Sequence, residues 1–287
     1  MKKRKTITEK RSAIRSLFRN RYFLAFFNGF LVATLIYTEI ESRSEAEVFR
    51  NIVHRINDEN SLSFPKDSFI VKAMHVSHFL LASNLPVFKD AKFSNFESSV
   101  IYPATFDLMT TNGMCGSFSR VLARTLQTNN IEVRFAQMEV QGTYGGHIIL
   151  EARSDHGWIV LDPMYDLSFK RPDGRLASFE DVHNNWTFYR QQLPEGYNPI
   201  YRYEGVQYTN WNKIPLLLPA LKMVLDVFIG KHRANEISIR TYFLRPYHVV
   251  FLITLLIFVP VFIFSSRRLW RIPALRFYSV RKMEMQS

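Results

Sequence analysis

The stretch GGHIILEARSDHGWIVLDP, Gly145 to Pro163, is the part of the sequence that decides the fold. Its two apolar runs alternate as half-buried strands do, and the polar SDHG segment between them has the composition of a turn. Two strands joined by so short a turn are expected to form an antiparallel hairpin. The sequence therefore predicts an antiparallel sheet.

The register of this hairpin has a chemical consequence. If Arg153 faces Trp158, paired residue numbers sum to 311 and Asp162 lies opposite Ile149. Ile149 shares a face with His147, so the imidazole and the Asp162 carboxyl become diagonal neighbours, about 7–8 Å apart at the backbone. A turn with an odd number of residues would put Asp162 on the other face.

The only cysteine, Cys115, lies in TTNGMCGSFSRVLARTL, Thr110 to Leu126. A single thiol is either an inert core residue or a nucleophile. The segment after it predicts a helix that Asn129 and Asn130 end. This helix is expected to bury Phe118, Val121, Leu122 and Leu126 and to carry Arg120 and Arg124 on its other face. Cys115 then lies in the first turn, where unpaired N–H groups and the helix dipole favour a thiolate.

Together these segments resemble the transglutaminase-like superfamily, whose pattern is a Gly-x-Cys at a helix start, an I-x-x-R strand, a His-led strand and a W-x-x-x-D-P strand. Here the pattern is carried by Gly113, Cys115, Ile131, Arg134, His147, Trp158, Asp162 and Pro163. The resemblance covers about Met109 to Asp166, with spacings of 32 residues from Cys to His and 15 from His to Asp. It implies an α+β fold of the papain-like transglutaminase type, with a nucleophile helix packed on an antiparallel sheet.

The resemblance also implies a catalytic triad of Cys115, His147 and Asp162. A thiolate attacks an amide or ester carbonyl, the imidazole delivers a proton to the leaving group, and the carboxylate orients the imidazole. Water or an amine then resolves the acyl-enzyme, which gives hydrolysis or acyl transfer. The chemistry needs neither a cofactor nor a metal ion, and none is expected.

Residues around the triad are less clearly assigned. The backbone N–H of Cys115 is a candidate donor to the oxyanion. Further candidates for oxyanion or substrate contacts are Asn112, Trp158 and Tyr144. Related proteins commonly carry an acidic or aromatic residue just after the cysteine, whereas this chain has Gly116 and Ser117.

Charge patterning argues for a membrane protein. The formal net charge is +12, but residues 1–21 carry nine Lys or Arg against one Glu, and residues 267–287 carry six against one. The basic residues therefore belong to the two ends, which makes a nucleic-acid surface a poor explanation. Each end adjoins an uncharged run, of 17 residues at 22–38 and 21 residues at 246–266, and both predict transmembrane helices flanking the domain.

The expected organisation follows from these runs. It comprises a basic cytoplasmic tail at 1–21, a transmembrane helix at 22–40, a periplasmic transglutaminase-like domain at 41–213, an amphipathic or interfacial segment at 214–245, a transmembrane helix at 246–266 and a basic cytoplasmic tail at 267–287. Basic flanks stay on the cytoplasmic side, which predicts a bacterial inner-membrane protein with both termini inside. Two alternatives remain open: the first run as a cleaved signal peptide, and Ile214 to Gly230 as a third span.

Within the domain, helical patterns run from Ser44 to about Asn84, and IEVRFAQMEV predicts a strand followed by a QGTYGG loop. Downstream, RPDG predicts a turn and Ser178 a helix cap with Asp181 three residues on, opening a helix towards Tyr189. IYRYEGVQYTNW, residues 200–211, is expected to close the sheet.

The rival function is a non-catalytic envelope or polysaccharide-assembly protein that uses the same fold for binding. His75 and His78 fit an ordinary helix, and His156 is a competitor for His147 at the hairpin tip. One cysteine and no closely spaced histidines give metal chemistry no obvious ligand set. Expected partners are a peptide, amide or envelope-polymer substrate, the bilayer and a possible membrane protein, but no nucleic acid.

Overall fold

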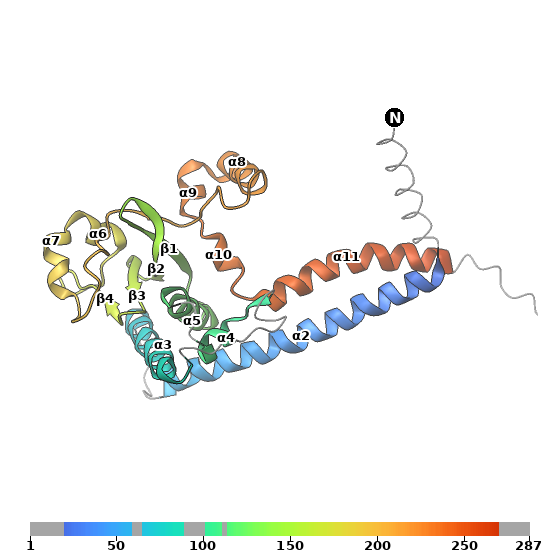
Figure 1. The fold of residues 1–287 in the computed structure, drawn as a ribbon, viewed down its shortest axis with the longest axis horizontal. Helices are drawn as coiled ribbons and strands as arrows, with labels where there is room; N and C mark the ends of the chain where they lie inside the picture. The colour runs from blue at the N-terminus through green and yellow to red at the C-terminus, as the bar shows by residue number, and fades with distance from the viewer. Residues whose placement is uncertain (1–19, 59–64, 89–100, 111–113, 270–287) are drawn as a thin grey trace, which may run out of the picture. The chain divides into compact units, whose positions relative to one another are not determined.

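The computed structural model describes residues 20–58, 65–88, 101–110 and 114–269. The chain divides into two compact units, one comprising Met1–Glu41 and His248–Ser287 and the other Ser42–Tyr247. Each unit is described by itself below, with the element labels of Figure 1. The predicted tails at 1–21 and 267–287 lie almost wholly outside the described residues.

The unit Ser42–Tyr247 is built on a five-stranded antiparallel sheet in the order β4-β3-β2-β1-β5. The strands are β1 Val133–Val140, β2 Thr143–Ser154, β3 Gly157–Asp162, β4 Leu167–Ser168 and β5 Val206–Gln207. In the central hairpin Arg153 pairs with Trp158, and Leu150 pairs with Leu161. This is the predicted register, and the edge strand β5 confirms that the tyrosine-rich segment closes the sheet.

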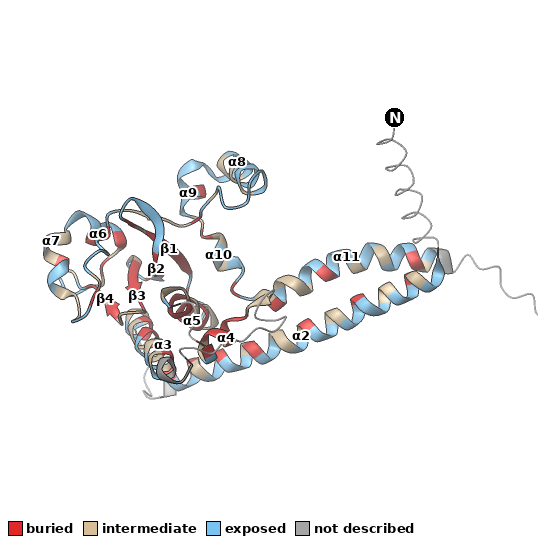
Figure 2. Cartoon of the chain, viewed as in Figure 1, coloured by how far each residue is buried: buried red, intermediate tan, exposed pale blue. Residues whose placement is uncertain are grey.

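One face of the sheet packs against α3 (Lys66–Phe88) and α5 (Cys115–Thr128). Their apolar stripes meet the alternate residues of the strands, and Leu122, Phe135 and Leu150 belong to the same buried cluster. The short helix α4 (Ala104–Thr110) and the second half of α2 (Arg21–Asp58) cover the outer side of α5. Figure 2 shows the buried residues gathered on the sheet and on α5.

Helix α5 differs from its prediction on one side. Its expected buried face is buried, and Asn130 has the expected left-handed backbone, with φ 57°. Arg124, however, is only 3% exposed, because its guanidinium lies over the Phe49 ring of α2. The face of α5 that carries Arg124 is therefore also an interface and not a solvent-exposed face.

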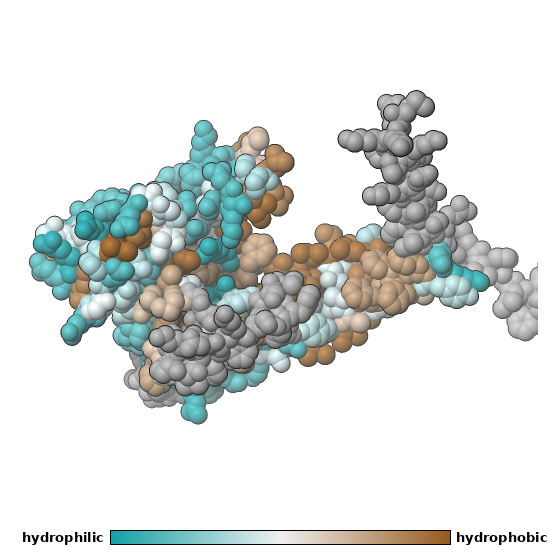
Figure 3. Space-filling view, in the orientation of Figure 1, coloured by the Kyte–Doolittle hydropathy of each residue, from teal (hydrophilic) through white to brown (hydrophobic). Residues whose placement is uncertain are grey.

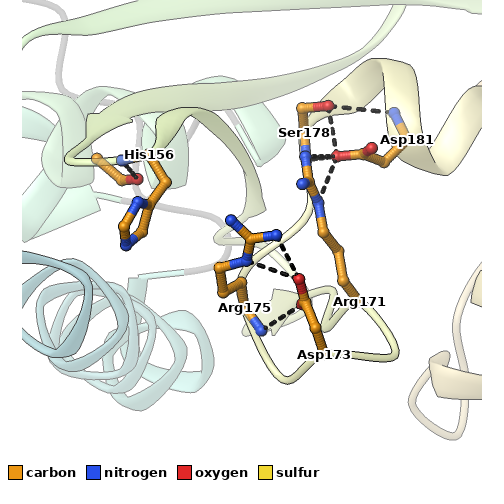
Figure 4. Close-up of polar contacts among 7 residues, drawn as sticks. His156, Arg171, Asp173, Arg175, Ser178 and Asp181 are labelled. Carbon is orange, nitrogen blue, oxygen red and sulfur yellow. Dashed lines mark hydrogen bonds and ion pairs between the residues drawn. The ribbon is translucent and has the colours of Figure 1, made fainter.

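The opposite face of the sheet is covered by α6 (Phe179–Asn184) and α7 (Trp186–Tyr189), and α7 continues into η2 (Arg190–Gln192). Ser178 caps α6, and Asp181 returns the hydrogen bond in a capping box, as predicted. Figure 4 shows this pair with Arg171, whose guanidinium donates to the Asp181 carboxylate at 2.9 Å. The predicted helix to Tyr189 is interrupted at Asn185, where φ is −132°.

The predicted QGTYGG loop is shorter in the structure. Strand β2 begins at Thr143, and the register against β1 shifts between Met138 and Glu139, which forms a β-bulge just before His147. Gly145 has φ +92°, and a Cβ atom on Gly146 would lie 2.7 Å from Val140 Cβ. Both glycines are therefore required for the bulge that precedes His147 and sets its position on the sheet.

The other unit contains the first half of α2 and α11 (Pro246–Leu269). Among the described residues, two helices are long and apolar enough to cross a membrane, within Arg21–Asn57 and Pro246–Arg267. Only 17% and 11% of their apolar windows are buried, as expected for lipid-facing helices. Asn28 donates to Ser265 Oγ at 2.9 Å, a polar contact between the two helices.

The first span and the helix expected from Ser44 are one continuous element, α2. The segment expected to be interfacial forms α8 (Leu217–Ile229), α9 (Lys231–Glu236) and α10 (Ile239–Tyr242).

Candidate active site

Cys115 is the first residue of α5, and its side chain is half-buried. The preceding residue, Met114, has φ 42° and ψ −121°, and no side chain of the described residues caps the helix. The positive φ turns the chain sharply into the helix and leaves its first turn open. The thiol therefore lies at an uncapped helix N-terminus and can be reached from solvent.

His147 lies on β2 after the bulge, and its side chain is fully buried. Its Nε2 atom is 2.7 Å from Oδ2 of Asp162, at the end of β3, and Asp162 is also buried. The hairpin register thus places the imidazole and the carboxylate on one face, as predicted. A buried imidazole hydrogen-bonded to a buried carboxylate is held in one orientation.

The second ring nitrogen of His147, Nδ1, is buried without a hydrogen-bond partner among the described residues. The thiol of Cys115 and this imidazole lie close enough for each to change the pKa of the other. Because Nε2 is occupied by Asp162, Nδ1 is the atom available to the thiol. Such contacts are often loose before substrate binds.

The electrostatics favour a charged pair. Burial raises the pKa of Cys115, but the nearby His147 imidazole and a hydrogen bond from the Ile148 backbone outweigh it, so the pKa is lowered. Burial lowers the pKa of His147, whereas the hydrogen bond to Asp162 and the nearby Cys115 thiol raise it, to about 9 overall. Both changes stabilise a thiolate beside an imidazolium.

Three tyrosines that the sequence analysis missed surround the imidazole. The ring of Tyr201 stacks on His147 with centroids 4.1 Å apart and an interplanar angle of 7°. Tyr165 meets the imidazole edge-on at 6.1 Å, and the Tyr197 hydroxyl lies 3.5 Å from Asp162 Oδ2. Tyr201 also lines a cavity of about 860 Å³ together with residues that include Trp186, Arg190 and Arg202. The density of tyrosines between residues 197 and 208 was the available signal.

A second missed group anchors the start of α5. Ser117 donates a 2.6 Å hydrogen bond to the buried carboxylate of Asp107 on α4. The same carboxylate accepts from Tyr102 at 3.1 Å and lies 3.2 Å from the Arg120 guanidinium. Burial raises the pKa of Asp107, and these three partners oppose it. Ser117, which departs from the transglutaminase-like pattern, therefore has a structural role two residues after Cys115.

Trp158 and Tyr144, the other predicted site residues that the structure describes, have contacts of their own. Trp158 packs under the Arg134 guanidinium at 4.3 Å and lines another cavity, of about 580 Å³. Trp158 pairs with Arg153, six positions along β2 from His147, or about 20 Å away. The hydroxyl of Tyr144 bonds Glu139. Asn112 lies outside the described residues, so its proposed oxyanion contact stays a prediction.

Three of the other histidines have polar partners of their own. His156 is exposed at the hairpin tip, and its backbone N–H donates to Ser154 Oγ at 3.0 Å (Figure 4). His75 Nδ1 lies 2.6 Å from Oδ1 of Asp166, and His78 Nδ1 donates to the Pro163 carbonyl at 3.0 Å. Across the described ranges, no three His, Cys, Asp or Glu side chains are grouped to hold a metal ion.

Comparisons with known proteins add no assignment. No family model matches the chain, and neither a curated protein nor a solved structure matches it. The resemblance to the transglutaminase-like superfamily therefore rests on the residues quoted above.

Proposed function

We propose that this protein is a membrane-anchored cysteine hydrolase or acyltransferase of the transglutaminase-like type, with Cys115, His147 and Asp162 as its triad. The observation that carries the proposal is the arrangement of His147. One ring nitrogen is held by a buried carboxylate at 2.7 Å, and the other is unpartnered beside the only thiol of the chain.

The reaction follows from that arrangement. The Cys115 thiolate attacks the carbonyl carbon of an amide, and the electron pair of the C=O bond moves to the oxygen. When the tetrahedral intermediate collapses, the C–N bond breaks and the His147 imidazolium gives its proton to the departing amine. The product is a thioester on Cys115 and a neutral imidazole.

The second half of the reaction reverses these roles. Neutral His147 takes a proton from water or from an acceptor amine, which attacks the thioester and releases the thiolate. Asp162 accepts a hydrogen bond from Nε2 throughout and stabilises the imidazolium whenever it forms. Water as acceptor gives hydrolysis, and an amine gives acyl transfer.

The two candidate spans and the basic ends support a location in the bacterial inner membrane, with both termini in the cytoplasm and the central domain in the periplasm. The substrate is then a peptide or another amide of the cell envelope. In an oxidising compartment a chain with one cysteine avoids disulfides, which suits a thiol kept for chemistry.

The test is to trap the acyl-enzyme. The full-length chain in nanodiscs is mixed with p-nitrophenyl acetate or peptide amides, quenched in acid and weighed by mass spectrometry. An acyl adduct that hydroxylamine removes, and that is absent in Cys115→Ala, supports the proposal. His156→Ala is the matched control, because that histidine is exposed at the hairpin tip and should leave the adduct unchanged. No adduct with any acyl donor argues against catalysis.

A second candidate is a non-catalytic envelope protein that uses this fold for binding. The observation favouring it is the complete burial of His147 beneath the stacked ring of Tyr201, since a leaving group must reach the imidazole. Tyr201→Ala separates the candidates. In an enzyme it changes the rate of adduct formation, whereas in a binding protein no adduct forms before or after the change.

A further inference from the structure

Helix α8 (Leu217–Ile229) is apolar but contains no buried residue. Lys222 and Asp226 are its only charged side chains, while Val227 is 78% exposed and Phe228 is 81% exposed. The other exposed apolar side chains of the helix are Leu217, Leu221, Met223, Val224 and Ile229. Figure 3 shows apolar side chains gathered over α8. An apolar surface of this extent on one helix indicates an apolar contact outside the described chain.

The helix is turned the opposite way to one that packs on its own domain. Lys222 and Asp226 form an ion pair at 2.9 Å, and their side chains are only 27% and 20% exposed. Leu218 and Leu225 lie on the same side of the helical wheel and are also half-buried, and α8 contacts α9. The polar pair therefore faces the chain. The exposed apolar side chains named above, which we call the apolar arc, face outwards. A helix of a soluble domain has the reverse orientation.

The rest of this segment points to a bilayer as the apolar contact. Helix α11, which is long and apolar enough to cross a membrane, begins at Pro246, 17 residues after α8 ends. Residues 213–245 carry six Lys or Arg against two Asp or Glu. The basic side chains Lys213, Lys231, Arg233, Arg240 and Arg245 are exposed. This combination of an apolar arc and flanking cations suits an anionic lipid surface.

The length of α8 decides how it meets the bilayer. At ~1.5 Å per residue its 13 residues span about 20 Å, short of a hydrocarbon core of ~30 Å. The helix can therefore lie at the membrane surface, but it is too short to cross the bilayer.

We propose that α8 is a membrane-surface helix that inserts its outward apolar arc into an anionic bilayer, on the side of the membrane that carries the domain. Val224, Val227 and Phe228 enter the boundary between headgroups and acyl chains, about 5–10 Å deep, and the Lys222–Asp226 pair stays on the protein side. This contact does not depend on the chemistry of Cys115.

The single cysteine makes a direct test possible. In a Cys115→Ala background, one cysteine at a time is placed at Val224, Asp226 or Phe228 and labelled with a nitroxide. Each full-length variant is reconstituted in vesicles of phosphatidylethanolamine and phosphatidylglycerol, and collisions with oxygen and with a water-soluble nickel complex are measured by EPR. His232, on α9, is the matched control, because its side chain is 89% exposed and it lies outside the apolar arc.

The expected result is high oxygen and low nickel accessibility at positions 224 and 228, low accessibility to both reagents at 226, which faces the chain, and high nickel accessibility at 232. Nickel accessibility at positions 224 and 228 would overturn the proposal, because α8 would then lie in water. Immobilised labels at 224 and 228 with low accessibility to both reagents would also overturn it, since a protein surface would be the contact. In vesicles of phosphatidylcholine, which has no net charge, the labels at positions 224 and 228 should insert less deeply into the bilayer. An unchanged insertion depth would contradict the proposed role of anionic lipid.

Discussion

Replacing Asp162 with asparagine removes the charge of the triad carboxylate and keeps the size of its side chain. His147 has a pKa of about 9 against an ordinary value of 6.5, and burial alone would lower it. The rise corresponds to about 3 kcal/mol in favour of the imidazolium, at ~1.36 kcal/mol per pKa unit. Without the carboxylate, burial is opposed only by Cys115, so the pKa should fall to about 6.5 or lower.

The assay is an NMR titration of the histidine side chains in the isotope-labelled, full-length chain in nanodiscs. The chain has eight histidines, so His147→Gln identifies the resonance. The wild type should lose this proton near pH 9, and Asp162→Asn at or below about pH 6.5. A midpoint that stays above about pH 8 in the asparagine variant would refute the assigned role of Asp162.

The same pair predicts a change of stability with pH. Because the pKa of His147 is raised in the folded state, its contribution is complete below pH 6.5 and is lost as the pH rises through about 9. The lowered pKa of Cys115 offsets this loss in the wild type, since the thiolate–imidazolium pair holds as many protons as the neutral pair. The free energy of unfolding of Cys115→Ala should therefore fall by at most about 3 kcal/mol between these two pH values, as measured by thermal unfolding. The double variant Cys115→Ala with Asp162→Asn should show no such fall.

Three further substitutions test the framework around the triad. Gly146→Ala should slow alkylation of the thiol by iodoacetamide, because its Cβ would lie 2.7 Å from Val140 Cβ in the bulge before His147; an unchanged rate would contradict this role of the bulge. Phe49→Ala should cost about 3–5 kcal/mol in thermal unfolding, because the ring is fully buried between α2 and α5, and a loss under about 1 kcal/mol would contradict that packing. Ser178→Ala should cost about 1 kcal/mol through loss of the cap shared with Asp181 and leave alkylation of the thiol unchanged, so slower alkylation would show that the cap reaches the active site.

The sequence was most informative where the chemistry is local. The hairpin register followed from a short turn and an alternating pattern, and it placed His147 and Asp162 on one face. The start of α5 followed from a helical stripe that begins just after Cys115. Such features depend on neighbouring residues, so their signals are complete within a short segment.

The missed features depend on residues far apart in the chain. Arg124 is buried because Phe49 and neighbouring residues of α2 cover it. Tyr201 stacks on His147 from 54 positions downstream, and the sequence of neither segment predicts that contact. Helix α2 was divided at the change from apolar to charged composition, but residues 38–48 contain no glycine or proline to end a helix.

The central claim is that Cys115 and His147 form a reactive ion pair, and the rate of Cys115 alkylation against pH tests it most directly. Iodoacetamide is applied from pH 5 to pH 10 to the full-length wild type and to His147→Ala, with His156→Ala as control. The account predicts a wild-type midpoint clearly below the ordinary thiol value of 9.0. It also predicts that at pH 7 the alkylation rate is at least about tenfold lower in His147→Ala than in the wild type, and unchanged in His156→Ala. An ordinary thiol midpoint in the wild type, indifferent to the loss of His147, would contradict it.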